Sequence, residues 1–248
     1  MFGDMNAAFL AKSDFEFQHA QAHTQPLRNA LLRFDAVFTL NQDLLLEYRY
    51  LFENVAPNTA GRWEGFQIPG LARFARGGND ATPEVYWVPR TPAEFKVAPK
   101  MQPYFKLHGS SNWNDPSGGP LLVMGGNKAS EIRFHPILSW YYQLFEQYMR
   151  EANSRLLVIG YGFGDEHINA AIAGAVEKSN LKLFIIDPQG ADLPWKSNQS
   201  RTKGSIAVPT SLEEMFRRSV IGASRRSLGE IFGGDSVEYT KVMRFIAS

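Results

Sequence analysis

The chain has 248 residues, of which 44% are hydrophobic and 21% are charged, so it has the composition of an ordinary globular protein and is long enough to bury a full core. Its 26 Lys and Arg residues and 25 Asp and Glu residues leave a formal net charge of +1, which does not favour a nucleic acid as partner. Because the chain contains no cysteine, disulfides, cysteine nucleophiles and four-cysteine zinc sites are excluded.

Short apolar runs predict strands that are buried on both faces. The runs are "AVFTL" at 36–40, "YFKLH" at 104–108, "LLVMG" at 121–125, "RLLVIGY" at 155–161 and "KLFIID" at 182–187. Strands that are apolar along nearly their whole length are typical of a parallel sheet.

Helix-like segments alternate with these strands. They are "TQPLRNALLRF" at 24–34, "QDLLLEYRYLF" at 42–52, "PILSWYYQLFEQYMREAN" at 136–153 and "DEHINAAIAGAVEKSN" at 165–180. The alternation predicts an α/β fold with a Rossmann-like, doubly wound parallel sheet, in a single domain that covers residues 1–248.

Two further segments have other patterns. Residues 54–100 are rich in Pro, Gly, Arg and aromatic residues, which indicates a small inserted helical or loop-rich subdomain or lid, or else a long connection on the sheet edge. Near the C-terminus we expect a strand, "SIAVPT" at 205–210, and then a helix at 211–223 that begins with a capping box of Ser211 and Glu214.

Polar or glycine-rich turns follow the predicted strands, at the edge of the sheet where such folds bind ligands. In "FTLNQD", Thr39, Asn41 and Asp43 alternate as the chain leaves the first strand. Asn41 or Asp43 could instead be the N-cap of the next helix. This motif alone therefore leaves both interpretations open.

The stretch "YFKLHGSSNW" places His108 directly after a strand, beside a glycine and two serines. Small neighbours are expected to leave its ring accessible, and an imidazole is suited to accept a proton near neutral pH. The other histidines, at positions 19, 23, 135 and 167, are interpreted first as hydrogen-bonded core residues.

The stretch "VIGYGFGDEHINAAI" contains a strand, three glycines and a helix for which Asp165 is the expected cap. Glycines allow a nucleotide to approach the backbone closely, but the spacing is not GxGxxG, and the acidic residues at the helix start would repel a phosphate. The next strand ends at Asp187, whose carboxylate could accept hydrogen bonds from ribose hydroxyls or cap a local turn.

Taken in order, "TLNQD", "KLHGS", "VIGYGFGD" and "IID" resemble the sirtuin family, and more closely the sirtuin-like NAD hydrolases of bacterial antiphage defence, over about residues 27–188. The resemblance implies that Asn41 holds the ribose and a water near its anomeric carbon, and that His108 is the catalytic base. The other residues that it places against NAD are Thr39, Asp43, Gly160, Tyr161, Gly162, Phe163 and Asp187.

The same resemblance implies that NAD is the substrate and that it is cleaved to nicotinamide and ADP-ribose without a metal. Deacylating sirtuins usually carry a four-cysteine zinc module, so a chain without cysteine favours an NAD glycohydrolase, with no zinc, over a protein deacylase. The alternative is a non-catalytic domain that senses a nucleotide or oligomerises.

That alternative has its basis in a difference from the family, which begins with a strand and a Gly-Ala-Gly-x-Ser turn around the NAD phosphates. No such unit precedes "FTLNQD", so we expect the first βα unit to be missing. The resemblance also implies NAD or ADP-ribose as ligand and a homo-oligomer or a partner defence protein. No apolar run approaches the roughly 20 residues that span a membrane, so we expect a cytoplasmic protein without membrane contact.

Overall fold

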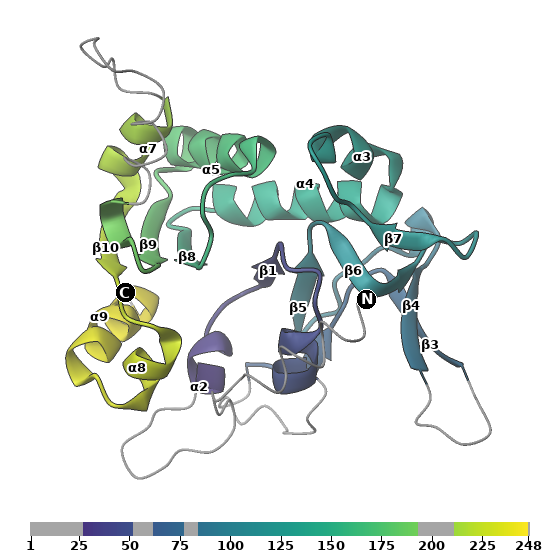
Figure 1. Cartoon of the computed structure of the whole chain (residues 1–248), viewed down its shortest axis with the longest axis horizontal. Helices are drawn as coiled ribbons and strands as arrows, with labels where there is room; N and C mark the ends of the chain where they lie inside the picture. Colours follow the sequence, from purple (N-terminus) through teal and green to yellow (C-terminus); the bar gives the residue numbers. More distant parts are fainter. Residues whose placement is uncertain (1–26, 52–61, 77–83, 193–210, 248) are drawn as a thin grey trace. The chain divides into compact units, whose positions relative to one another are not determined.

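The computed structural model describes residues 27–51, 62–76, 84–192 and 211–247 (Figure 1). These residues form two compact units, one of them Leu31–Leu144 and the other made of 27–30 and 145–247. Each unit contains a parallel three-stranded sheet, and the chain has the α/β, Rossmann-like fold that its sequence predicts. The single-domain assignment stays a prediction.

The first unit has a parallel sheet with β5 in its centre. In sheet order its strands are β1 (Val37–Thr39), β5 (Met101–Lys106) and β2 (Gly65–Gln67). Phe38 on β1 lies opposite Phe105 on β5, and the two rings stack with centroids 4.7 Å apart. The ring of Tyr141, on helix α4 (Pro136–Arg150), meets Phe105 edge-on at 4.9 Å, so this helix covers the apolar face of β5.

The same unit contains a second, four-stranded sheet. In sheet order its strands are β3 (Leu71–Arg76), β4 (Glu84–Pro89), β6 (Gly109–Asn114) and β7 (Pro120–Leu122). Strand β6 was not predicted, because its small and polar residues lack the apolar pattern of a strand. The described part of 54–100 contains β2, β3, β4 and the short helix η2 (Pro92–Glu94), and its role as an inserted subdomain stays a prediction.

The second unit is built on β8 (Arg155–Ile159), β9 (Lys182–Ile186) and β10 (Val220–Ser224), with β9 in the centre and all pairs parallel. Helix α5 (Glu166–Ser179) connects β8 to β9. The predicted helix at 211–223 is wrong in its second half, because α7 ends at Ser219 and the chain continues as β10. Gly222 explains the change: a Cβ there would lie 2.6 Å from the Phe184 ring, so only glycine allows this close pairing with β9.

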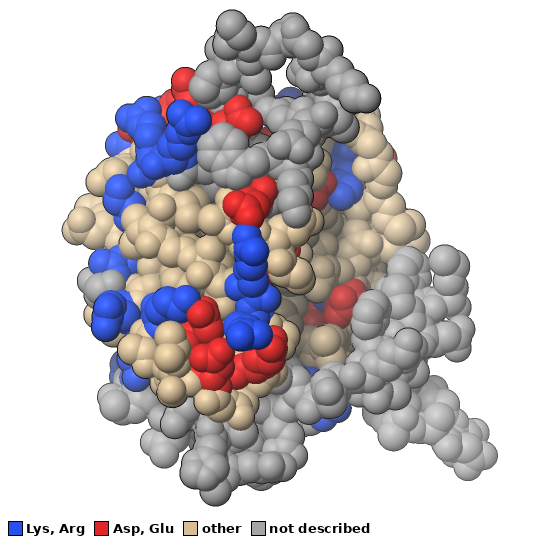
Figure 2. Space-filling model, turned by 60° about the vertical axis from the view of Figure 1, so that its left-hand side comes forward, with Lys and Arg blue, Asp and Glu red and all other residues tan. Residues whose placement is uncertain are grey.

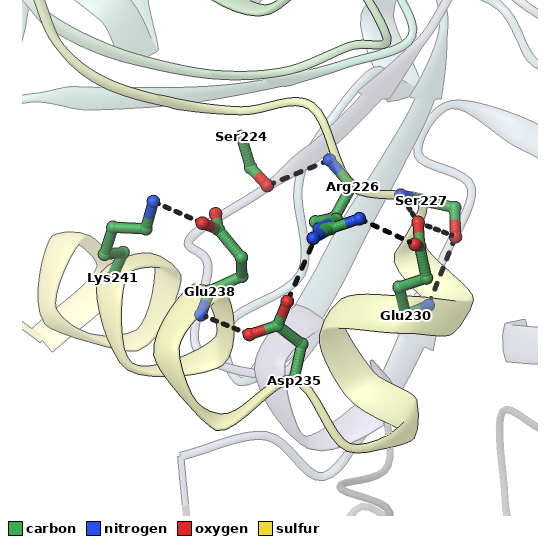
Figure 3. A network of polar contacts seen from close by, with 7 residues as sticks. All are labelled: Ser224, Arg226, Ser227, Glu230, Asp235, Glu238 and Lys241. Carbon is green, nitrogen blue, oxygen red and sulfur yellow. Dashed lines mark hydrogen bonds and ion pairs between the residues drawn. The ribbon is translucent and has the colours of Figure 1, made fainter.

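Two helices that the sequence analysis did not assign follow β10. Ser227 and Glu230 form a capping box at the start of α8 (Leu228–Gly233), and α9 (Ser236–Ala247) follows it. Arg226 pairs with Glu230 at 3.3 Å and with Asp235 at 3.5 Å (Figure 3). Basic and acidic side chains also lie side by side on the face drawn in Figure 2. Water screens such exposed pairs, so they contribute little to stability.

The remaining predicted helices are present with different bounds. They are α2 (Leu27–Leu31), η1 (Glu47–Leu51), α4 and α5, and η1 is a π-helix. A further short helix, α3 (Lys128–Phe134), follows β7. The predicted strand at 205–210, the side chain of Ser211 and residues 1–26, on which the prediction about a first βα unit depends, all lie outside the described residues. In the described ranges, no helix combines the length and the hydropathy that crossing a membrane requires.

Candidate functional site

The loop after β1 carries the first group of predicted site residues, and local hydrogen bonds fix its shape. The backbone N–H of Asn41 donates to the Thr39 hydroxyl oxygen at 3.0 Å. The Asp43 carboxylate accepts a hydrogen bond from the backbone N–H of Leu45 at 2.9 Å, so it caps the helical turn that follows. The Asn41 side chain is exposed, whereas Asp43 is half-buried.

Gln42 joins this loop to two other strand ends, and the sequence analysis missed it. Its Nε2 donates to the carbonyl oxygen of Val123 at 2.6 Å and to that of His108 at 3.4 Å. Its own carbonyl accepts a hydrogen bond from Ser111 N–H at 3.0 Å. Gln42 lies between two polar residues, and nothing in the sequence distinguishes a glutamine with this role from one that is simply exposed to solvent.

His108 lies in the turn between β5 and β6, and its backbone is held on both sides. Leu107 N–H donates to the Thr39 carbonyl at 3.0 Å, and the His108 carbonyl accepts from Val123 N–H at 2.9 Å. Gly109 makes the turn at a φ of +75°, where a Cβ would lie 2.2 Å from the Leu121 carbonyl oxygen. The expectation of an accessible ring is wrong as far as overall exposure goes, because only 2% of His108 is exposed.

A cavity of about 220 Å³ nevertheless opens beside His108. Its lining comes from the loop after β1, the turn after β5 and the segment after β7, and consists of Leu40, Gln42, His108, Val123, Met124, Gly125 and Lys128. Lys128 is the one charged residue among these lining residues. Three strand ends therefore converge on one cavity in the first unit, with an imidazole and a cation at its wall.

Beneath the same loop lies an ion pair that is almost completely buried. Lys106 is 0% exposed and Glu47 is 1% exposed, and Lys106 Nζ lies 2.5 Å from a Glu47 carboxylate oxygen. The other carboxylate oxygen accepts a hydrogen bond from the Tyr104 hydroxyl at 3.2 Å. Lys106 Nζ also donates to the backbone carbonyl of Asp43.

Burial dominates the ionisation of this group. It raises the pKa of Glu47 and lowers the pKa of Lys106, and the attraction between the two charges opposes both shifts. Burial also raises the pKa of Tyr104, and the neighbouring Glu47 carboxylate adds to that shift. In the sequence, this lysine lies within an apolar run that predicts a buried strand, and nothing in the run distinguishes it.

The second group of predicted residues is the glycine-rich loop after β8, in the second unit. Gly160 has a φ of +61° and Phe163 a φ of +53°, so the loop turns through two left-handed positions. Asn169 on α5 fixes it, because its Nδ2 donates to the Phe163 carbonyl at 2.8 Å and its Oδ1 accepts from the Tyr161 hydroxyl at 2.9 Å. A Cβ built on Gly162 meets no atom within 4 Å, so the backbone there is open to an approaching ligand.

Two acidic residues near this loop have local structural roles. Asp165 is the N-cap residue of α5, but its side chain makes no capping hydrogen bond, so the predicted cap is wrong in that respect. The Asp187 carboxylate accepts a hydrogen bond from Gln189 N–H at 2.8 Å, and thereby caps the turn after β9. Burial raises the pKa of Tyr161 above its ordinary value, so its hydroxyl keeps the proton that it donates.

The structure thus brings the predicted residues together in two sets. Thr39, Asn41, Asp43 and His108 lie on adjoining strand ends of the first unit. Gly160, Tyr161, Gly162, Phe163 and Asp187 lie at the ends of β8 and β9 in the second, where Gly160 N–H donates to the Ile186 carbonyl at 2.9 Å. Their roles toward a ligand stay predictions.

Parallel strands that end in polar and glycine-rich loops define a Rossmann-like α/β protein, a class that in general binds ligands at such strand ends. The chain belongs to the family of SIR2-like domains, whose family model matches residues 35–206, more than half of the sequence. Domains of this family bind NAD in general, so the function of the chain is related to NAD. No curated protein matches the chain.

In the part of the chain that the structure describes, no group of three or more His, Asp or Glu side chains is placed to hold a metal ion.

Proposed function

We propose that this chain binds NAD and cleaves it to nicotinamide and ADP-ribose. One observation carries the proposal: in a SIR2-like domain, His108 and the loop that bears Asn41 meet at one cavity. An imidazole at the cavity and an amide on the loop that borders it are the groups that this hydrolysis requires.

In this reaction the bond between the ribose anomeric carbon and the nicotinamide ring nitrogen breaks, and its electron pair goes to the nitrogen. Nicotinamide leaves as a neutral molecule, and an oxocarbenium-like centre develops on the ribose. The oxygen of a water molecule bonds to that carbon, and a proton of the water goes to His108. Asn41 orients the water and the ribose through its side-chain amide.

Lys128 has a separate role in this proposal. It is the one charged residue that lines the cavity, and no carboxylate is among the lining residues. A cation at the wall of a polar cavity favours an anionic group, so Lys128 meets a phosphate of the dinucleotide.

The test is chromatographic. The purified protein is incubated with NAD, and nicotinamide and ADP-ribose are followed over time beside the variants His108→Ala and His135→Ala. We expect nicotinamide release from the wild type, a loss of at least about a hundredfold in His108→Ala, because general acid–base groups contribute about that much, and little change in His135→Ala. Circular dichroism verifies the fold of each variant. Full activity in His108→Ala would remove this residue from the mechanism.

A nucleotide-sensing or oligomerising domain without turnover is the second candidate. It is favoured by the low exposure of His108 and by the local caps formed by the Asp43 and Asp187 carboxylates. Calorimetry with NAD and ADP-ribose separates the two functions. Binding without nicotinamide release would support the sensing domain, whereas release of nicotinamide would exclude it.

The biological setting follows from the sirtuin-like NAD hydrolases that the motifs resemble. We propose a cytoplasmic role in bacterial defence against phages, as a homo-oligomer or together with a partner defence protein. Light scattering of the purified protein with and without NAD tests the oligomer.

A further inference from the structure

Strand β5 carries an unusual row of buried polar side chains. Gln102, Tyr104 and Lys106 alternate along it, so all three face the same side of the sheet. Gln102 binds the backbone carbonyls of Leu31 and Phe34 at 2.9 and 2.8 Å. Tyr104 and Lys106 bind the segment that follows β1. This face of β5 therefore holds both the chain that enters β1 and the chain that leaves it.

Stability alone does not account for Lys106, the last residue of the row. Taking a lysine and a glutamate out of water is unfavourable for each ion, and well-packed apolar residues in place of such a pair are often neutral or stabilising. What apolar side chains cannot replace is the bond from Lys106 Nζ to the Asp43 carbonyl. This bond is therefore the specific contribution of the pair.

The bond from Lys106 to the Asp43 carbonyl is connected to the cavity through the loop after β1. Asp43 follows Gln42, whose side chain holds the carbonyls of His108 and Val123. Glu47 fixes the lysine from η1, a π-helical segment, and such segments are rare and recur at functional sites. A chain of bonds thus runs from the buried pair through the loop to the backbone of His108.

We infer that Lys106 and Glu47 are positioning residues, which hold the loop 40–43 in the shape that places Leu40 and Gln42 at the His108 cavity. The effect on NAD cleavage rests on the proposed function, but the effect on the loop does not. Lys106 touches the Asp43 carbonyl and Glu47, and acts on the substrate only through the loop.

The decisive variant is the double substitution Lys106→Met with Glu47→Leu, which removes both charges together. Tyr50→Phe is the matched control, because Tyr50 lies on the same η1 segment and its hydroxyl binds Gln102 rather than the loop. Hydrogen exchange is measured at the amides of Leu107 and Ser111, which donate to the carbonyls of Thr39 and Gln42. Values of kcat and KM for NAD are measured in parallel.

We expect a folded double variant whose Leu107 and Ser111 amides exchange about 10- to 100-fold faster, the factor that corresponds to one hydrogen bond to a charged group. We expect kcat/KM to fall by a similar factor, and Tyr50→Phe to match the wild type in both. Exchange at the wild-type rate in the double variant would overturn the inference.

Two arrangements keep this test decisive. If the wild type releases no nicotinamide, the proposed function fails, while the exchange rates still decide whether the pair positions the loop. If the double variant does not fold, Lys106→Met is measured at pH 5, where burial favours the neutral form of Glu47 and the single substitution is tolerated best. Wild-type exchange rates in that variant would also overturn the inference.

Discussion

At the scale of single residues, the predicted site depends on positions where the backbone turns at a positive φ. Gly109 turns the chain directly after His108, at a positive φ and against the Leu121 carbonyl. Gly160 and Phe163 do the same after β8, where Asn169 holds the loop. The glycines could be predicted because they follow apolar strands in the sequence. Asn169 and Gln42 could not, because their partners are distant in sequence or on another element.

Gly109→Ala tests the turn that carries His108. A residue with a side chain costs about 1–2 kcal/mol in the left-handed region, and the clash with the Leu121 carbonyl adds to this. We expect the free energy of unfolding to fall by more than about 2 kcal/mol, as measured by urea titration. Gly118→Ala is the control, because it has a φ of +92° and nothing within 4 Å of the added Cβ, and we expect a smaller loss there.

Gly162→Ala tests whether a ligand approaches the loop after β8. The added methyl group meets no protein atom within 4 Å, so we expect the free energy of unfolding to stay within about 0.5 kcal/mol of the wild type. If NAD lies against this backbone, its affinity falls by about tenfold or more, because the methyl group occupies the space of the nucleotide. Unchanged affinity in calorimetry would remove Gly162 from the binding site.

At the scale of elements, the buried strands were the easiest to predict. Strands β1, β5, β7, β8 and β9 all lie within or beside their predicted ranges, because runs that are apolar along nearly their whole length are stable only in a core. Strand β10 was missed because Val220 and the residues after it continue a helical pattern, and only pairing with β9 favours the extended form. At these residues the local preference for a helix contributes less free energy than the pairing with β9.

Lys106→Met tests the buried ion pair through its dependence on pH. Without the cation, Glu47 is buried with less compensation, so its pKa rises further above the ordinary value of 4.5. The folded protein then keeps a proton that the unfolded chain releases, and the free energy of unfolding falls as the pH rises above 4.5. We expect a loss of about 3–5 kcal/mol relative to the wild type at pH 7.5 and a smaller loss at pH 5.

The control for this prediction is Lys100→Met, which removes a pair with Glu64 that is 64% exposed on both sides. Water screens such a pair, so we expect at most a small loss of stability, similar at both pH values. Thermal unfolding of both variants across this pH range makes the comparison. A loss in Lys106→Met that does not grow between pH 5 and pH 7.5 would contradict the assignment of burial as the cause.

At the scale of the whole molecule, sequence determined the class of protein. Composition, the absence of cysteine and the order of apolar runs indicated an α/β protein without thiolate zinc, and the motifs after the strands indicated the sirtuin-like family. These properties depend on residue type and spacing, which are local and can be read along the chain.

Tertiary structure alone decided how the site is built. Several features of the fold depend on segments that are distant in sequence. They are the low exposure of His108, the role of Gln42, the pairing of β10 with β9 and the bond from Lys106 to the Asp43 carbonyl. A lysine in an apolar run has no distinct pattern until its partner is known. The physical reason is that burial and hydrogen bonding are properties of the folded neighbourhood, and the same residue in another neighbourhood would be exposed and solvated.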